Sequence, residues 1–127
     1  MQNVTHIFDN AFHNCTSLTT IDDVSKVIYI GGNVFNNCNS LTSLNLTNVC
    51  TKINESAFYR CQNLTTLGDT SNVIIGPIGN SMFEECNKLT SITFKSTTIT
   101  NSNSYMFKNC TNLTSITGDF TGITEFG

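Results

Sequence analysis

One short pattern occurs five times in this chain of 127 residues. In each copy an apolar residue precedes a Phe, a Cys follows the Phe by three positions, a Leu follows the Cys by three, and an Ile or Leu comes three positions later. The phenylalanines lie 23, 23, 25 and 24 residues apart, at Phe12, Phe35, Phe58, Phe83 and Phe107. A fixed period of this length predicts a solenoid, in which each repeat packs only against its neighbours.

The closing Leu-x-x-Ile/Leu of each copy indicates a leucine-rich solenoid. Its alternation of apolar and polar residues, as in Leu44-Asn45-Leu46, predicts a short strand. A second short extended segment ends in an Ile, such as Ile30 or Ile53. The Phe-x-x-Cys-x-x-Leu segment predicts one tight helical or 3-10 turn, because its apolar residues recur every third position. In four copies the residue two positions before the Phe is of N-cap type, namely Asn10, Asn33, Ser56 and Ser81, whereas the fifth copy has Tyr105 there.

These elements together predict an α/β-type repeat solenoid, with about five repeats of 23–25 residues, short parallel strands and short helical or 3-10 turns. The two longer steps predict extra residues in surface loops, around positions 69–73 and 96–98. Residues 1–127 are expected to form a single leucine-rich repeat domain. Since the sequence starts and stops within a repeat, we expect a fragment of a longer solenoid, whose uncapped ends favour end-to-end self-association.

The polar residues of the chain are mostly uncharged. Asn, Ser and Thr occur 18, 12 and 20 times, while only 12% of residues are charged and the net charge is -3. With no cluster of Lys and Arg, neither nucleic acid nor an anionic membrane surface is an expected partner. The longest apolar runs are four residues, so no membrane-spanning segment is expected.

The repeat cysteines are expected to be small core residues stacked rung upon rung, at roughly the 4.7–4.9 Å spacing of neighbouring strands. They are Cys15, Cys38, Cys61, Cys86 and Cys110. Equivalent side chains on neighbouring rungs point the same way, and five of them cannot pair off, so a disulfide framework is not expected. Neither a Cys-x-x-Cys motif nor a Cys/His cluster is present, so we expect no metal, no cofactor and no catalytic residues.

A candidate ligand-binding surface lies on the Leu-x-x-Ile strands, where small polar residues flank the Ile or Leu on both sides. This strand face consists of Thr20, Asp22, Ser43, Asn45, Thr66, Ser91, Thr93, Ser115 and Thr117. It has a structural explanation, because Thr favours strands and pairs across them. It also has a functional one, a docking surface for protein or glycan. An ice-binding array is disfavoured because Asp22, Asn45 and Gly68 interrupt its regularity.

Seven Asn-x-Ser/Thr triplets are possible N-glycosylation sites if the host modifies secreted proteins. Their acceptors are Asn3, Asn14, Asn45, Asn54, Asn63, Asn109 and Asn112. In a chain so rich in Asn and Thr, chance explains most of them. A glycan on Asn45 would obstruct the strand face.

The repeat unit closely resembles the BspA-like leucine-rich repeat, because Ala57-Phe58, Cys61 and Leu64 reproduce the Ala-Phe-x-x-Cys-x-x-Leu core of that family. The resemblance covers about five repeats, although the frequent Pro after the strand is missing. It implies a curved right-handed solenoid in a cell-surface or secreted adhesin, such as a surface antigen, that binds host or matrix protein or glycan and has no enzymatic activity. The alternative is an intracellular, cytoplasmic leucine-rich repeat scaffold for protein-protein interaction, in which reduced cysteines need no special explanation.

Overall fold

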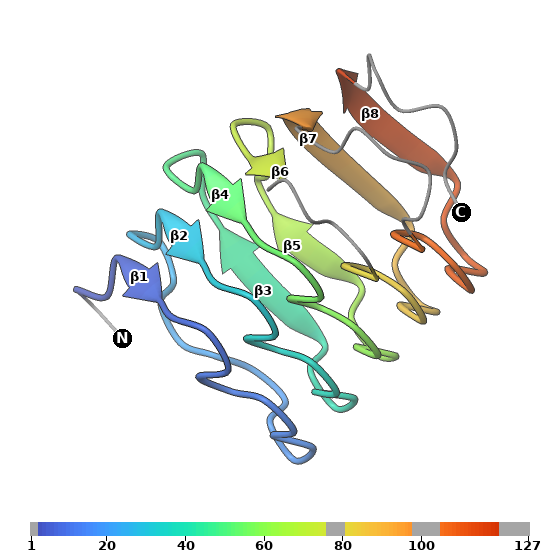
Figure 1. The fold of residues 1–127 in the computed structure, drawn as a ribbon, viewed down its shortest axis with the longest axis horizontal. Coiled ribbons are helices and arrows are strands. Elements are labelled where there is room, and N and C mark those ends of the chain that lie inside the picture. The colour runs from blue at the N-terminus through green and yellow to red at the C-terminus, as the bar shows by residue number, and fades with distance from the viewer. Residues whose placement is uncertain (1–2, 76–80, 98–104, 120–127) are drawn as a thin grey trace.

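The computed structural model describes residues 3–75, 81–97 and 105–119 of the chain. Short parallel strands run through these residues, and Figure 1 shows them side by side in successive rungs. One sheet contains, in order, β1 (His6–Ile7), β2 (Tyr29–Ile30), β4 (Lys52–Ile53), β6 (Ile74–Ile75), β7 (Ser91–Thr97) and β8 (Ser115–Asp119). The other sheet contains β3 (Ser43–Leu46) and β5 (Thr66–Gly68). The parallel strands predicted from the repeat are therefore present.

Equivalent residues of successive repeats lie next to each other across the rungs. Ile7 pairs with Ile30, and Ile30 pairs with Ile53. All three side chains are buried. A repeat that places the same apolar residue at the same height in every rung therefore builds one continuous core.

The repeat phenylalanines form a stack through this core. The ring centroids of Phe35 and Phe58 lie 5.3 Å apart, and those of Phe58 and Phe83 lie 5.6 Å apart. The stack extends to Phe12 and Phe107 at 5.5 and 5.7 Å, with nearly parallel rings. The three central rings are fully buried, which contributes on the order of 1.5–3 kcal/mol each. The predicted stacking is confirmed.

The repeat cysteines lie beside the phenylalanines and point inward. Cys38, Cys61 and Cys86 are fully buried, whereas Cys15 and Cys110 are half-buried. The thiols of Cys38, Cys61, Cys86 and Cys110 each donate a hydrogen bond to the Phe carbonyl of the preceding repeat, and the bond from Cys38 to Phe12 measures 3.0 Å. All six cysteines are free thiols, and the burial of the three central repeat cysteines confirms their predicted core role.

The segment around each repeat Phe is a chain of turns, so the helical or 3-10 prediction is wrong for the described residues. Its backbone N–H groups alternate in direction. Asn36 and Cys38 donate within their own turn, to the carbonyls three residues earlier. Phe35 and Asn37 donate instead to Ala57 and Tyr59 of the next repeat, at 2.8 and 2.7 Å. A helix needs consecutive N–H groups to bond along the chain, and every second one here joins two rungs.

The N-cap prediction for the residues two positions before the Phe is also wrong. They adopt positive φ, whereas an N-cap residue is normally extended. The φ angles are 64° at Asn10, 57° at Asn33, 52° at Ser56 and 61° at Ser81. The residues two positions after the Phe are also left-handed, for example Asn14 at 60°. Asn tolerates this region better than most residues, which explains its abundance in these turns.

The predicted insertion at positions 69–73 is wrong, and the one at positions 96–98 is wrong for Ser96. Val73 donates to Thr70 as Cys50 does to Thr47, so the path from β5 to this point has the usual length. Ser96, expected in an insertion, lies in β7 and pairs with Ile74 of β6. Thr98, the last residue of the second predicted insertion, lies outside the described residues.

Candidate functional site

The predicted strand face lies on β3, β5, β7 and β8 and on the equivalent part of the first repeat. Register partners place Ser43 beside Thr66, and Ser91 beside Ser115. Eight of the nine residues are exposed and Ser43 is half-buried, while Leu44 and Leu67 between them are buried. The alternation predicted from the sequence is therefore present.

A column of threonines beside the strand face bonds one rung to the next. The hydroxyl of Thr42 donates to the carbonyl of Thr19 at 3.2 Å, and that of Thr65 to Thr42 at 2.9 Å. Thr114 repeats this bond to Thr90 at 3.1 Å. The carbonyls also accept the backbone N–H of the same threonines. The recurrence of Thr in this column therefore has a structural cause, because each hydroxyl ties its rung to the preceding one.

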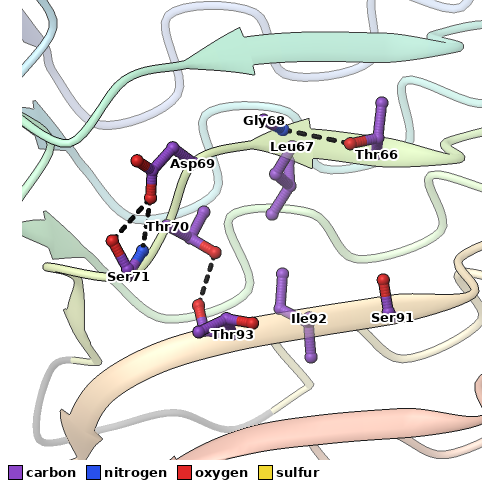
Figure 2. Close-up of a pocket in the computed structure, with 9 residues that line it drawn as sticks. All are labelled: Thr66, Leu67, Gly68, Asp69, Thr70, Ser71, Ser91, Ile92 and Thr93. Atoms are coloured by element: carbon purple, nitrogen blue, oxygen red, sulfur yellow. Dashed lines mark hydrogen bonds between the residues drawn. The ribbon is translucent and has the colours of Figure 1, made fainter.

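The threonine ladder is interrupted once within the described residues, between Thr65 and Thr90, where neither kind of bond forms. Here β5 ends the smaller sheet and β7 continues the larger one. A hollow of about 180 Å³ opens between the two strands. Figure 2 shows the residues that line it, namely Thr66, Leu67, Gly68, Asp69, Thr70, Ser71, Ser91, Ile92 and Thr93.

Both walls of the hollow are polar at the rim. On the β5 side, the Thr66 hydroxyl accepts the N–H of Gly68 at 3.1 Å. The Asp69 carboxylate accepts the N–H and the O–H of Ser71, at 3.0 and 2.6 Å. These bonds lower the pKa of Asp69 below its ordinary value, so this exposed carboxylate is ionised at neutral pH. The floor is apolar, because Leu67 and Ile92 are buried.

The hollow arises where the geometry of the rungs changes. Gly68 adopts a φ of 79°, and a Cβ on it would lie 2.5 Å from the carbonyl oxygen of Leu46, so only glycine fits this close approach to β3. Thr47 donates back to Ser25 of the preceding repeat at 2.8 Å, whereas the buried Thr70 donates forward to the Thr93 carbonyl. In the sequence, this change in the geometry of the rungs is signalled only by the 25-residue spacing between Phe58 and Phe83.

The predicted N-glycosylation sites differ in accessibility. Asn54 and Asn63 are half-buried, while the other five are exposed, namely Asn3, Asn14, Asn45, Asn109 and Asn112. The side-chain nitrogen of Asn63 donates to the Asn39 carbonyl at 2.6 Å, and that of Asn112 to Asn87 at 2.8 Å. These two amides therefore bridge neighbouring rungs, and a glycan there would replace a structural bond.

Among residues 3–75, 81–97 and 105–119, no group of three or more His, Cys, Asp or Glu side chains is placed to hold a metal ion. In the same residues, no helix has the length and hydropathy needed to cross a membrane.

Residues 1–114 match the family described as "BspA type Leucine rich repeat region", in six copies. The fold is similar to that of the leucine-rich repeat protein TpLRR of T. pallidum, with a TM-score of 0.69 and 21% identity, over 91% of this chain and 67% of that one. A leucine-rich cell surface protein of Faecalibacterium prausnitzii aligns with a TM-score of 0.36 and 19% identity, over 93% of this chain and 52% of that one. No match was found among curated proteins.

Proposed function

Because the chain belongs to the BspA-type leucine-rich repeat family, we propose that it is a non-enzymatic interaction module of a cell-surface or secreted adhesin, which binds a host or matrix protein or a glycan through its strand face. The observation that carries the proposal is the strand face itself, where seven of the nine side chains carry hydroxyls and all but the half-buried Ser43 are exposed, with a polar hollow among them. A rigid core below it holds these groups in fixed positions, which lowers the entropy cost of binding.

The test replaces Ser43, Thr66 and Ser91 together by Arg and measures binding to an array of glycans and extracellular matrix proteins. We expect the variant to lose binding to the ligands of the unsubstituted protein, because three long cationic side chains would cover the strand face. A matched control places Arg at three exposed positions directly after the repeat cysteines, Thr16, Gln62 and Thr111. Binding that survives in the strand-face variant but not in the control would move the site to the turns.

An intracellular scaffold is the second candidate, and the free thiols favour it, because disulfides are rare in reducing compartments and all six cysteines are unpaired. The two candidates differ in location. Surface biotinylation of intact cells that produce the full-length parent should label it if it is an adhesin. Labelling only after lysis would support the scaffold.

A further inference from the structure

We infer that the hollow between β5 and β7 is a binding site for one neutral sugar unit, such as a terminal hexose of a glycan. This inference rests on the proposed function, since it names the ligand class of the same strand face. It depends on the two strand edges, on the width of the gap between them, and on the charge of the lining.

The first observation is that two strand edges face the hollow without pairing with each other. In the described residues, β5 is hydrogen-bonded to β3 alone, and the Ser91–Thr93 half of β7 is bonded to β8. The edge of a parallel strand presents both N–H donors and C=O acceptors. The hydroxyls of Thr66 and Ser91 also lie on these walls. A ligand that fits must therefore both donate and accept, which a sugar hydroxyl does.

The width of the gap excludes a peptide strand. A peptide strand inserted between β5 and β7 would have to pair with both of them. The two strands would then have to lie two inter-strand spacings apart, or roughly 9.6 Å. The Thr70 hydroxyl instead bonds directly to the Thr93 carbonyl across one end of the gap, which holds the walls closer together. The volume of about 180 Å³ is many times that needed to hold a single water, and it is on the scale of one six-membered sugar ring.

The charge of the lining selects a neutral ligand. Asp69 is the one charged residue among the nine that line the hollow, and its carboxylate is ionised. Phosphate, sulfate and uronic acid groups would meet this charge with no lysine or arginine in the lining to offset it. Neutral hydroxyls can instead donate to the carboxylate, in charge-assisted bonds.

The test uses saturation-transfer NMR with the methyl glycosides of glucose, galactose and mannose, and with methyl glucuronide as the anionic probe. We expect at least one neutral glycoside to bind in the millimolar range, and the glucuronide at least about tenfold more weakly than the glucoside. Ser91→Leu should fill the hollow and weaken neutral binding at least about tenfold. Ser115→Leu, the register partner on β8, is the matched control and should change it less than about twofold.

Three results would overturn the inference: no binding of any neutral glycoside, binding that Ser91→Leu leaves intact, or a peptide ligand that Ser91→Leu displaces. If Ser91→Leu lowers the unfolding temperature markedly, Thr66→Leu fills the hollow from the other wall, with Ser43→Leu as its control. The experiment with the three strand-face arginines tests the proposed function independently of the sugar site. Loss of a protein ligand there, without sugar binding here, would preserve the proposed function and reject the sugar site.

Discussion

The thiol of Cys61 donates a hydrogen bond to the carbonyl oxygen of Phe35, at 3.1 Å across 26 residues of chain. The same carbonyl accepts the backbone N–H of Cys38 at 3.0 Å. Its two lone pairs are thus both used, one within its own turn and one by the next rung. Serine could donate in the same way, but its hydroxyl is costlier to bury than a thiol. The column needs a side chain that both donates a hydrogen bond and is cheap to bury, which explains why cysteine recurs in it.

The first prediction compares two buried cysteines. Cys61→Val should destabilise the protein by about 1–3 kcal/mol, because it removes the donor and adds a branched side chain to a fully packed column. Cys50→Val should cost less than about 1 kcal/mol, because Val27 and Val73 occupy the same position in other repeats. Urea unfolding measures both. Equal costs would show that the thiol-carbonyl bond contributes nothing.

The second prediction concerns alkaline pH. Burial raises the pKa of Cys38 and Cys50 to about 11, from an ordinary value of 9.0. Below pH 9 the thiols are protonated in both states, so their contribution to stability is complete. Between about pH 9 and 11 only the unfolded state ionises, and each thiol should cost up to about 1.4 kcal/mol of stability per pH unit. Urea unfolding at pH 7, 9 and 10 tests this.

A control separates the thiols from other groups that titrate in the same range. Cys50→Val removes one raised pKa, so its stability should fall less steeply between pH 9 and 10 than that of the parent protein. Identical slopes would show that the Cys50 thiol does not contribute to the loss of stability at alkaline pH.

The third prediction concerns the aromatic stack. Phe58 is fully buried between Phe35 and Phe83, so Phe58→Ala should cost about 3–5 kcal/mol. Phe8 is 68% exposed, with its ring stacked on that of the exposed His6 and tilted against that of Tyr29, so Phe8→Ala should cost less than about 1 kcal/mol. Thermal unfolding of both variants gives the comparison. A cost at Phe8 as large as that at Phe58 would contradict a core built on the repeat phenylalanines.

How much the sequence could predict is clear from particular residues. Phe35, Phe58 and Phe83 recur in phase, and only stacking rungs can bury such a series, so the core was predictable. The turn around each Phe was not, because apolar residues at every third position fit consecutive turns as well as a helix. Asn10 and Asn14 held the missing signal, since Asn is the residue most tolerant of positive φ after glycine.

The extra residues and the hollow depend on register, which the sequence left ambiguous. In this repeat, the second short strand could be formed by Val73-Ile74-Ile75 or by the apolar residues that follow. Only the pairing of Ile53 with Ile75 decides between these two registers. The predicted strand-face residues did include Thr66, Ser91 and Thr93, which line the hollow. The gap itself follows from the absence of pairing between β5 and β7, a property of no single residue.

The fourth prediction concerns left-handed backbone. Ser81 has a φ of 61°, where a β-branched residue is strained and glycine is not. Ser81→Val should therefore destabilise the protein by about 1–2 kcal/mol, while Ser81→Gly should stay within about 0.5 kcal/mol of the parent. Both are measured by urea unfolding, and each serves as the control for the other. If valine were tolerated as well as glycine, the turn would not require positive φ there.

The fifth prediction concerns the bond that closes one end of the hollow. Thr70 is buried and donates to the Thr93 carbonyl, so Thr70→Val should cost about 1–3 kcal/mol by leaving that carbonyl without its partner across the gap. Thr47→Val removes the equivalent bond to Ser25 on an exposed loop, where water can replace it, and should cost only about 0.5–1 kcal/mol. Hydrogen exchange should also accelerate at Ser91 and Thr93 in the first variant alone, because Thr70 directly bridges the two strands. Equal costs and unchanged exchange would mean that the walls of the hollow are held by the core rather than by this hydroxyl.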